Sequence, residues 1–526
     1  MQLNKTRLLF SMLALWGHSA LVMAEIVPQN GTPDSVNQVP VVNINAPGAD
    51  GVSHNRYSQF DVGTQGAILN NSATESHTAL AGKVAGNNQL GGRGAAVILN
   101  EVNSSNKSVL NGLVEVAGQR ADVVIANKAG ITCNGCGFIN ARNGVLTTGE
   151  VQFKNGAFSG YKVEQGNILV EGQGMKKGDV DYTAILARTE TISASVHAES
   201  LLVSAGKKNI SADLTQINPA AFSKDKPDVL IDVAELGGMY AGKIKLVATE
   251  NGVGINSTGA LVPVGLVNRG HIQAQQGGVA IAADALVNHG DIASTGQLGI
   301  STGLLQNNGR VQANNDVAID AILLNNTGSL RAENGAMALR SNSLNNGAEI
   351  RAERDMQLST TQLNNSGSVQ TAKGSLRLMA AGVNNIGQIQ AGQGLQLSAT
   401  QLSNLGGIRT ENGGLSILTT SLNNGGQVQS GGALHINSAN VLNFSNGTLA
   451  AQDDVNIQGS SIDNFGRIVS RSSSVGFNSV RLYNRGEVEA AGDISSRGLL
   501  FSNPGSMVSS TGVVTHNGKA IKKPVH

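Results

Sequence analysis

Apolar and polar residues alternate with a fixed period through the second half of the chain. From Leu266 onward a nine-residue phrase recurs with the pattern L-x-N-x-G-x-I-x-A, as in "LVNRGHIQA" and "LNNSGSVQT". Each copy is followed by a second alternating run, such as "SLRLMA" or "GLQLSA". Alternation at a period of two predicts β-strands rather than helices. The thirteen copies begin 19 or 20 residues apart, at residues 266, 286, 305, 324, 344, 363, 383, 402, 422, 442, 462, 482 and 501, and such a constant step indicates a repeat architecture.

A period of 19–20 residues accommodates two or three short strands with glycine turns and leaves no room for a helix. This favours one coil of a parallel β-helix, in which coils stack at the inter-strand spacing of about 4.8 Å. Thirteen such coils would form a rod about 60 Å long. The leucine and isoleucine or valine positions are predicted to point into the narrow interior. A leucine-rich repeat has a similar period, but its L-x-x-L-x-L spacing before the asparagine is absent here.

The asparagine of the phrase is predicted to be structural. When asparagines stack at the same turn, their amides can hydrogen-bond to one another along the axis as a ladder. A ligand site rarely needs twelve equivalent copies, and the G-G-x-G-x-D repeats of calcium-binding solenoids do not occur. The twelve copies with this residue contribute Asn268, Asn288, Asn307, Asn326, Asn346, Asn365, Asn385, Asn404, Asn424, Asn464, Asn484 and Asn503.

The glycine two residues after this asparagine recurs in eleven copies. We expect it at a corner where φ is positive, a conformation that glycine adopts without steric cost. Ala348 and the shifted Asn446 replace it in the other two copies. The copy that begins at Leu442 is therefore predicted to be disturbed.

The first half of the mature chain lacks the strict period. Residues 25–260 nevertheless keep the alternating chemistry in segments such as "ADVVIAN" and "NILVEG", which predicts strands of a less regular β-helix. The polar, proline-containing stretch 206–240 predicts a hairpin that leaves the helix. Residues 25–50 hold four prolines and predict an N-terminal cap, which a solenoid needs to cover its open strand edge.

Composition and the N-terminus indicate an exported protein. The 526 residues include 67 glycines, only 3% are aromatic, and the net charge is +1, which gives no support for nucleic acid as a partner. Residues 1–24 combine Lys5 and Arg7 with an apolar run and a final "VMA", which predicts a signal peptide that ends before Glu25. We expect no transmembrane segment, because no stretch has the length of apolar residues that a spanning helix requires.

Several segments resemble, in order, those of two-partner secretion exoproteins, the family of filamentous haemagglutinins, haemolysins and contact-dependent inhibition toxins. They are "HNRYSQFDV" (54–62), residues 98–131, "TCNGCGFINARNGVLTTG" (132–149) and the later repeats. The resemblance implies a partner, an outer-membrane β-barrel transporter that recognises the N-terminal domain through its periplasmic domains and exports the chain unfolded. It also implies a secretion (haemagglutination activity) domain at 25–265 on a right-handed β-helix, haemagglutinin-type repeats at 266–505 and a C-terminal tail at 506–526.

The family's secretion motif, commonly Asn-Pro-Asn-Gly-Ile, corresponds here to "NKAGI" at 127–131. Asn127, Gly130 and Ile131 match the motif, whereas Lys128 stands where a proline would preset φ. The family's Asn-Pro-Ser is likewise "NKS" at 106–108. We expect Asn127 and its turn to form the address that the transporter reads, with both turns looser than in other members.

Cys133 and Cys136 are the only cysteines of the chain. A zinc site would need two more ligands, and the nine histidines show no metal spacing. A thioredoxin-like centre would need the C-x-x-C to open a helix beside a βαβ unit. Cysteine-bearing members of the resembled family have this same pair, which predicts a small disulfide that pins the turn after Ile131 in an oxidising periplasm. Two reduced, partly buried thiols are the alternative.

The sequence contains no motif of a serine hydrolase, zinc protease or phosphate-binding loop. We therefore expect neither an enzyme nor a cofactor or metal. The resemblance predicts a secreted adhesin-like or haemagglutinin-like exoprotein that passes through the periplasm to the cell surface or the extracellular space. Its further partner would be a host or neighbouring-cell surface. The alternative is the truncated stick of a haemolysin or contact-dependent growth inhibition toxin that lacks its C-terminal effector.

Overall fold

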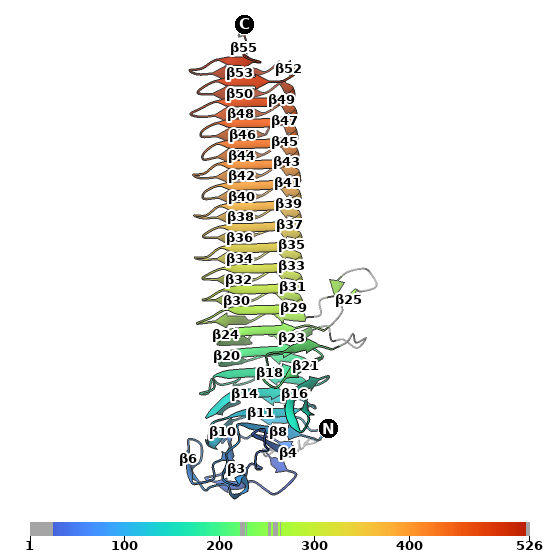
Figure 1. Cartoon of the computed structure of the whole chain (residues 1–526), viewed down its shortest axis with the longest axis vertical. Helices are drawn as coiled ribbons and strands as arrows, with labels where there is room; N and C mark the ends of the chain where they lie inside the picture. Colours follow the sequence, from blue (N-terminus) through green and yellow to red (C-terminus); the bar gives the residue numbers. More distant parts are fainter. Residues whose placement is uncertain are drawn as a thin grey trace, which may run out of the picture.

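The computed structural model describes residues 25–220, 227, 229–250, 254–255, 261–262 and 265–521, and the predicted signal peptide 1–24 lies outside these residues. The described chain forms a straight rod with its N-terminal coils at one end and its C-terminal coils at the other (Figure 1). Its described part contains no α-helix and one short 3-10 helix, η1 (Asn88–Leu90). Most strands belong to a single 42-stranded sheet that winds around the rod, so the prediction of an all-β parallel β-helix is confirmed.

Each coil of the repeat region consists of a ten-residue strand followed by a four-residue strand. In β33 (Val317–Asn326) the inward side chains are those of residues 317, 319 and 321 and then 324 and 326, so the alternation changes phase around the exposed Ile322. The long strand therefore bends there and forms two faces of the coil, and the short strand β34 (Ser329–Ala332) forms the third.

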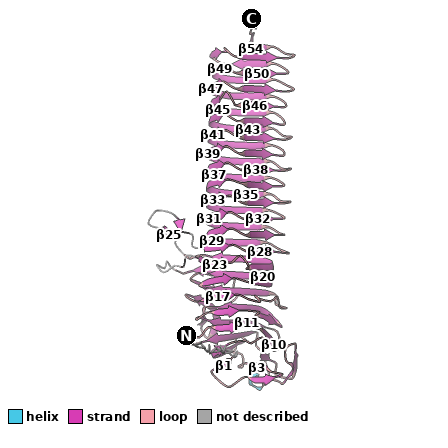
Figure 2. Cartoon of the chain, turned by 180° about the vertical axis from the view of Figure 1, so that it is seen from behind, coloured by secondary structure: helices cyan, strands magenta, loops and turns pink. Residues whose placement is uncertain are grey.

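The strands of successive coils pair in parallel and in register, each with its equivalent 19–21 residues away (Figure 2). The long strands are β29 (Val279–Asn288), β31 (Leu298–Asn307), β33, β35 (Met337–Asn346), β37 (Met356–Asn365), β39 (Leu376–Asn385), β41 (Leu395–Asn404), β43 (Leu415–Asn424), β45 (Leu434–Asn443), β47 (Val455–Asn464) and β49 (Val475–Asn484). The short strands are β28 (His271–Ala274), β30 (Asp291–Ser294), β32 (Arg310–Ala313), β34, β36 (Glu349–Ala352), β38 (Ser368–Thr371), β40 (Gln388–Ala391), β42 (Gly407–Thr410), β44 (Gln427–Ser430), β46 (Thr448–Ala451), β48 (Arg467–Ser470) and β50 (Glu487–Ala490).

The repeat asparagines form one continuous ladder of amides. From Asn268 to Asn503, each Nδ2 donates to the Oδ1 of the asparagine in the next coil at 2.6–2.8 Å. The ladder backbone carbonyl also accepts two N–H groups from the next coil, as Asn385 does from Leu405 and Gly406. Each ladder asparagine thus provides hydrogen-bond partners for both backbone and side-chain groups of the next coil at the same corner.

Asn443, which the sequence analysis did not assign to the ladder, fills the place of the copy that begins at Leu442. Val441, not Leu442, pairs with Leu422 and Ile462, so this phrase begins one residue earlier than predicted. The turn between Asn443 and Thr448 holds four residues, two more than the turn between Asn424 and Gln427, and Thr448 returns to register opposite Gln427. The prediction of a disturbed copy was therefore wrong for the ladder and right only for the turn.

The repeat glycines are not required for a positive φ, because none of them has one. They are required for a close approach: a Cβ on Gly387 would lie 2.1 Å from the carbonyl oxygen of Gly367 in the coil before it. Where Ala348 replaces the glycine, the backbone nitrogen of Glu349 lies 3.3 Å from the carbonyl oxygen of Gly328, compared with 2.7 Å for Ser368 and 2.8 Å for Gln388 at the same place. The alanine is accommodated by lengthening this bond between coils.

The N-terminal coils are built from strands of uneven length. They are β4 (Val52–Phe60), β8 (Val97–Val102), β9 (Ser108–Leu110), β11 (Ala121–Asn127), β12 (Ile131–Cys133), β14 (Ala141–Thr147), β17 (Asn167–Val170), β18 (Tyr182–Ala187), β19 (Thr189–Ile192), β20 (Ser195–Ala205), β23 (Val229–Val233), β24 (Gly238–Ala248) and β27 (Gly265–Asn268). Their inward Leu, Ile and Val side chains form one hydrophobic core with those of the repeats. The two regions therefore share an interior.

The N-terminal cap extends beyond the predicted residues 25–50. Strand β1 (Ile26–Pro28) pairs antiparallel with β4. A five-stranded sheet continues the third face, in the order β13 (Gly137–Ile139), β10 (Leu113–Gly118), β5 (Ala67–Asn71), β3 (Val39–Asn43) and β2 (Asp34–Val36), and a hairpin of β6 (Ser76–Thr78) and β7 (Gly82–Val84) lies beside it. The antiparallel pairing with β1 closes the edge that a parallel coil would leave open.

Two excursions leave the β-helix, and the first is formed by two segments that are separate in the sequence. Strands β15 (Glu150–Lys154), β16 (Ala157–Val163), β21 (Lys208–Ser211) and β22 (Ile217–Pro219) form an antiparallel sheet outside the coils. The predicted excursion 206–240 is thus correct only in its first part, because β23 and β24 belong to the coils, while residues 221–226 and 228 are outside the described chain. The second excursion contains β25 (Gly254–Ile255) and β26 (Leu261–Val262), which pair antiparallel. This pair projects from the side of the rod (Figure 1).

The C-terminal end is also structured, in contrast to the predicted tail at 506–526. Strands β51 (Ile494–Arg497), β52 (Leu500–Ser502) and β53 (Ser506–Ser509) pair with the preceding coil. Strand β54 (Val514–His516) pairs with β51 and turns back through Asn517-Gly518 into β55 (Lys519–Ala520). Residues 522–526 lie outside the described chain.

Four charged side chains are buried where the outer sheet leaves the coils. Arg188 pairs with Glu250, whose side chain is 3% exposed. Lys208, at 1% exposure, donates through Nζ to the hydroxyl of Ser204 and the carbonyl of Ala205. Burial lowers the pKa of Lys208 to about 8, against the attraction of Glu190 and Glu250. Burial likewise raises the pKa of Glu190 well above its usual value, although Lys208 and the N–H of Ala187 oppose the shift.

The ladder predicts a cost for removing one amide. Asn385 is fully buried, donates to Asn404 and Gly407 and accepts from Asn365. We expect Asn385→Ala to lower the free energy of unfolding by about 1–3 kcal/mol, because the Oδ1 of Asn404 loses its donor. The exposed neighbour Asn384→Ala is the matched control, with an expected change within about 0.5 kcal/mol. Denaturant unfolding monitored by circular dichroism measures both, and equal effects would contradict the ladder's energetic role.

The buried lysine predicts a pH dependence. A lysine whose folded pKa is lowered destabilises the fold while it is protonated, and this penalty disappears as the pH rises from about 8 towards 10.5. The shift corresponds to about 3 kcal/mol. We expect Lys208→Met to be stabilised relative to the parent protein at pH 7, and this advantage to shrink by about that amount towards pH 10.5. Unfolding of the exposed control Lys243→Met should show no such trend, and a constant difference for Lys208→Met would count against the penalty.

Candidate functional site

The motif residues 127–131 form a tight turn at the end of β11. The N–H of Gly130 donates to the carbonyl of Asn127 at 3.0 Å, and the N–H of Ala129 donates to the Asn127 side-chain Oδ1 at 2.9 Å. Gly130 has a φ of +122°, where a side chain would be strained, and a Cβ there would lie 3.0 Å from the carbonyl oxygen of Asn167. Ile131 is buried in the core. The turn therefore needs these residue types for its own geometry.

The amide of Asn127 connects this turn to the turn directly beside it. Its Nδ2 donates to the carbonyl of Asn106 at 2.9 Å and to the hydroxyl of Ser108 at 3.0 Å. The N–H of Ser108 donates in return to the carbonyl of Gly130 at 3.1 Å. The two segments that the sequence analysis singled out separately, 106–108 and 127–131, are thus brought together as one stacked pair of turns.

The stacked turns bury their asparagine and expose their lysines. Asn127 has no exposed surface, and all of its side-chain hydrogen-bonding groups are used. Lys107 and Lys128, by contrast, are both exposed, one on each turn. In the folded protein, Asn127 therefore shapes this surface and the lysines form part of it.

Asp61 and Gln59 also support the turns, although the sequence analysis gave them no role. The carboxylate of Asp61 accepts the N–H of Val109 at 2.7 Å, and the side chain of Gln59 donates to Asp61 at 2.6 Å and to the carbonyl of Lys107 at 3.2 Å. Both residues lie in the segment "HNRYSQFDV" that had been noted for its resemblance. The segment could therefore be recognised in the sequence, but only the fold shows that Gln59 and Asp61 contact the turn at 106–108.

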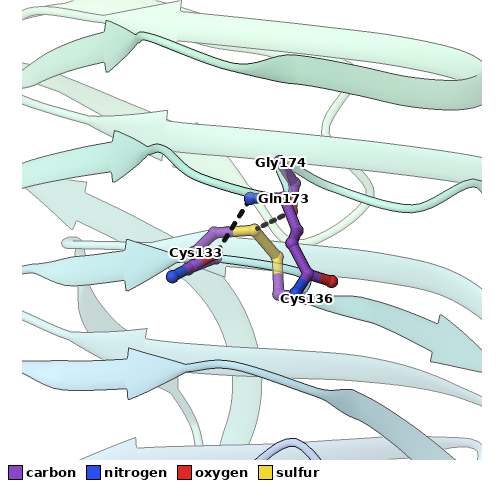
Figure 3. Close-up of a disulfide and its surroundings, with 5 residues drawn as sticks. Cys133, Cys136, Gln173 and Gly174 are labelled. Carbon is purple, nitrogen blue, oxygen red and sulfur yellow. Dashed lines mark hydrogen bonds between the residues drawn. A yellow bond between two sulfur atoms is a disulfide. The ribbon is translucent and has the colours of Figure 1, made fainter.

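Cys133 and Cys136 are joined in a disulfide at the corner that follows the turn (Figure 3). Their Cα atoms are 5.2 Å apart, and both side chains are buried. Residues Gln173 and Gly174 of the next coil cover the bridge, with the Gly174 carbonyl oxygen 3.4 Å from the Cys133 sulfur. Because an oxidised sulfur has no proton to donate, this is a close packing contact.

The disulfide occupies the same corner of the coil as the asparagine ladder. Through successive parallel pairs, the Cys133 position continues to Val170, Ile192, Val233 and finally Asn268. The Cys136 position continues in the same way to Met175, Val196, Met239 and Ile272, the isoleucine of the first repeat phrase. A covalent bond thus spans, in one N-terminal coil, the corner that an amide occupies in every repeat.

Within the described residues, no three His, Cys, Asp or Glu side chains are arranged to hold a metal ion. No helix in this part of the chain is long and apolar enough to cross a membrane. The arrangement of turns, exposed lysines and a pinned corner can present a surface to a partner.

Two family models match the chain. Residues 24–279 match the TPS secretion domain, where TPS stands for two-partner secretion, and residues 412–521 match the haemagglutinin repeat. The predicted domain boundary at 265/266 falls inside the first match.

Curated relatives match the N-terminal half. The chain is 46% identical over 291 residues to "Toxin CdiA" of Yersinia pestis, which is 54% of this chain and 8% of the relative. It is 41% identical over 271 residues to "tRNA nuclease CdiA" of Yersinia mollaretii, 50% of this chain and 9% of the relative. The chain therefore spans less than a tenth of the length of these relatives.

Two solved secretion domains are also similar. The filamentous haemagglutinin secretion domain is 28% identical with a TM-score of 0.45, covering 57% of this chain and 96% of that one. The HMW1 secretion domain from Haemophilus influenzae is 13% identical with a TM-score of 0.21, covering 93% and 97%. With a secretion domain followed by haemagglutinin repeats in a single chain, this protein belongs to the two-partner secretion exoproteins.

Proposed function

We propose that this chain is exported across the outer membrane by a dedicated β-barrel transporter whose periplasmic domains bind its N-terminal coils. The observation that carries the proposal is the stacked pair of turns at 106–108 and 127–131, tied by one buried amide within the secretion domain. The turns place Lys107 and Lys128 on the surface, where a partner can reach them. Transit through the periplasm and release at the cell surface or outside the cell follow from this route.

Within this address, Asn127, Gly130 and Ile131 act as positioning residues. The amide of Asn127 has no exposed surface and fixes the two turns relative to each other. A transporter that reads the folded turns would contact Lys107, Lys128 and Ala129 rather than Asn127. The Cys133–Cys136 bridge and the asparagine ladder are assigned structural roles, because both stabilise the same corner of the coil.

The exported rod is proposed to serve as an adhesin-like or haemagglutinin-like surface toward a host or neighbouring cell. A rod of stacked coils exposes a long lateral face while each coil contacts only its neighbours. This geometry suits a protein that must reach away from the membrane and still tolerate variation on its outer side chains.

A toxin stick is the second candidate, favoured by the identity of the N-terminal half to CdiA toxins. The nuclease activity in the name of one of these proteins belongs to that protein, and the matched region is less than a tenth of its length. We propose no catalytic role for the chain described here.

The proposed address predicts a selective loss of export for Asn127→Ala. The substitution removes the two bonds to residues 106 and 108 and the bond from Ala129, so the two turns lose their fixed relation. We expect export to fall at least tenfold when the full chain is produced with its cognate transporter, measured as protein outside the cells relative to total protein.

Asn71→Ala is the matched control. Asn71 is equally buried, donates to Ala95 and Gln119 and accepts from the Ala95 N–H, but it lies away from the turns. Both variants should lose similar stability, about 1–3 kcal/mol, while only Asn127→Ala loses export. If the two variants are exported equally, Asn127 is only a structural residue and the address lies elsewhere.

A further inference from the structure

A cleft of about 680 Å³ lies between the coils and the extra-helical sheet. Strands β16 and β21 of this sheet lie beside the N-terminal coils (Figure 1). Its floor is the outer face of β8, β11, β14 and β18, with Asp122, Arg142 and Tyr182. Its opposite wall is formed by Phe158, Tyr161 and the loop 212–215. The volume falls within the range of about 300–1,000 Å³ that is typical of sites for small ligands. This cleft is separate from the stacked turns and the disulfide.

Aromatic rings provide the apolar part of the cleft. Tyr182 is half-buried on the floor, so one part of its ring remains accessible. Phe158 and Tyr161 pack edge to face on the opposite wall, with ring centroids 5.3 Å apart. Leu214, in the loop that closes this wall, has a φ of +60°, an unfavourable conformation for a branched side chain. The wall is thus held in place at some cost in backbone energy.

The hydroxyl of Tyr161 is an unused hydrogen-bond donor in this cleft. Only 2% of the residue is exposed, and no hydrogen bond within the described chain engages its hydroxyl. Burial, together with the negative charge of Asp122, raises the pKa of Tyr161, so the group remains protonated. Tyr161 lines the cleft and its oxygen is not among the buried atoms that lack a partner, so the hydroxyl is accessible to a ligand or to water.

The charged groups that line the cleft are two carboxylates, Asp122 and Asp213, and one guanidinium, Arg142. Arg142 Nε donates to Asp122 at 2.8 Å, and the amide of Asn143 donates to the same carboxylate oxygen at 2.9 Å. Asp213 on the loop is engaged by Ser211 and Thr215. The cleft therefore offers several fixed donors and acceptors without an excess of positive charge that would select an anion.

The cleft also offers no backbone edge to an extended peptide. Its central strands β11, β14 and β18 are each paired on both sides, and β8 pairs with β4 and β11. Binding by strand addition requires an unpaired edge. A ligand must therefore be recognised by the side chains alone.

We propose that this cleft binds a neutral saccharide, with a sugar ring against Tyr182 and its hydroxyls hydrogen-bonded by Tyr161, the Asp122–Arg142 pair and Asn143. A sugar presents an apolar face of C–H groups and an edge of hydroxyls, which matches the aromatic and polar parts of the cleft. Hydroxyls both donate and accept, so they can satisfy the Tyr161 hydroxyl and the Asp122 carboxylate together.

The proposal is tested with the full mature chain and a defined panel of sugars. Lactose, maltotriose and N,N′-diacetylchitobiose serve as neutral probes, and 3′-sialyllactose and a heparin disaccharide as anionic probes, with binding followed by ligand-observed NMR and calorimetry. We expect at least one neutral probe to bind. Tyr182→Ala should weaken its binding at least tenfold. Tyr161→Phe, which removes only the hydroxyl, should weaken it about threefold to tenfold without changing the melting temperature.

Tyr240→Ala is the control, since Tyr240 is also partly exposed on the coils but stacks on His197 outside the cleft. It should bind the sugar as the parent protein does. The proposal is overturned if no neutral probe binds, if only the anionic probes bind, or if Tyr182→Ala and Tyr161→Phe bind as tightly as the control. Because these measurements use purified protein, their outcome is independent of export.

Discussion

A buried side-chain amide needs both a donor and an acceptor, and in this rod each is supplied by the same residue one coil away. The asparagine of each repeat donates to the next and accepts from the one before, so a single residue type fixes the register along the whole ladder. Coils of 19, 20 and 21 residues all keep this ladder continuous, because the extra residues lie in the turns between the strands. A strand that was out of phase would instead bury an unsatisfied amide on both sides of itself.

The N-terminal coils close the same corner without the ladder. Cys133, Val170, Ile192 and Val233 occupy the position that asparagine holds in the repeats, and the first ladder residue, Asn268, lies against Val233. Its Oδ1 is a buried acceptor without a partner among the described residues. The change from apolar and disulfide-bridged corners to amide corners thus marks where the irregular coils of the secretion domain give way to the repeats.

The N-terminal coils do not follow a strict period, and they contain insertions of extra-helical strands that the repeat coils lack. The outer sheet of β15, β16, β21 and β22 packs a second hydrophobic cluster on the coils. Its attachment buries Lys208 and Glu190 at a cost to stability. The same attachment creates the cleft around Tyr161. The stacked turns at 106–131 and this cleft are both features that a uniform ladder region would not provide.

Local patterns were sufficient for the repeats and insufficient for these insertions. The period of 19–20 residues and the in–out alternation predict the coils and twelve of the ladder asparagines, because each coil contacts only its neighbours. The two extra residues of the turn 444–447 concealed Asn443, since the phrase was aligned on Leu442 rather than Val441. The positions of the repeat glycines were predicted correctly, but the predicted reason, a positive φ, was wrong. Glycine is required there because a Cβ would be too close to the backbone of the preceding coil.

The extra-helical hairpin of β15 and β16 was missed for a different reason. Alternation looks the same in a coil strand and in an antiparallel hairpin, and β16 pairs with β21, which is distant in sequence. Asn155-Gly156 forms the turn of the hairpin β15–β16, and Asn517-Gly518 forms the turn of the hairpin β54–β55. All four residues have a positive φ. An Asn-Gly pair between two alternating runs favours a hairpin, so this signal was available. The stacking of 106–108 on 127–131 could not be read from either segment alone.

The central claim, that the rod is a stack of coils held in phase by the asparagine ladder, is tested most directly by small-angle X-ray scattering on a chain without residues 324–382. This deletion removes three whole coils and brings Asn307 and Asn385 into adjacent coils. The account predicts a folded rod shorter by about 14 Å, with an unchanged cross-section. An out-of-phase deletion of 324–372 should instead disrupt the fold. An in-phase variant that unfolds, or one that keeps its full length, would contradict the account.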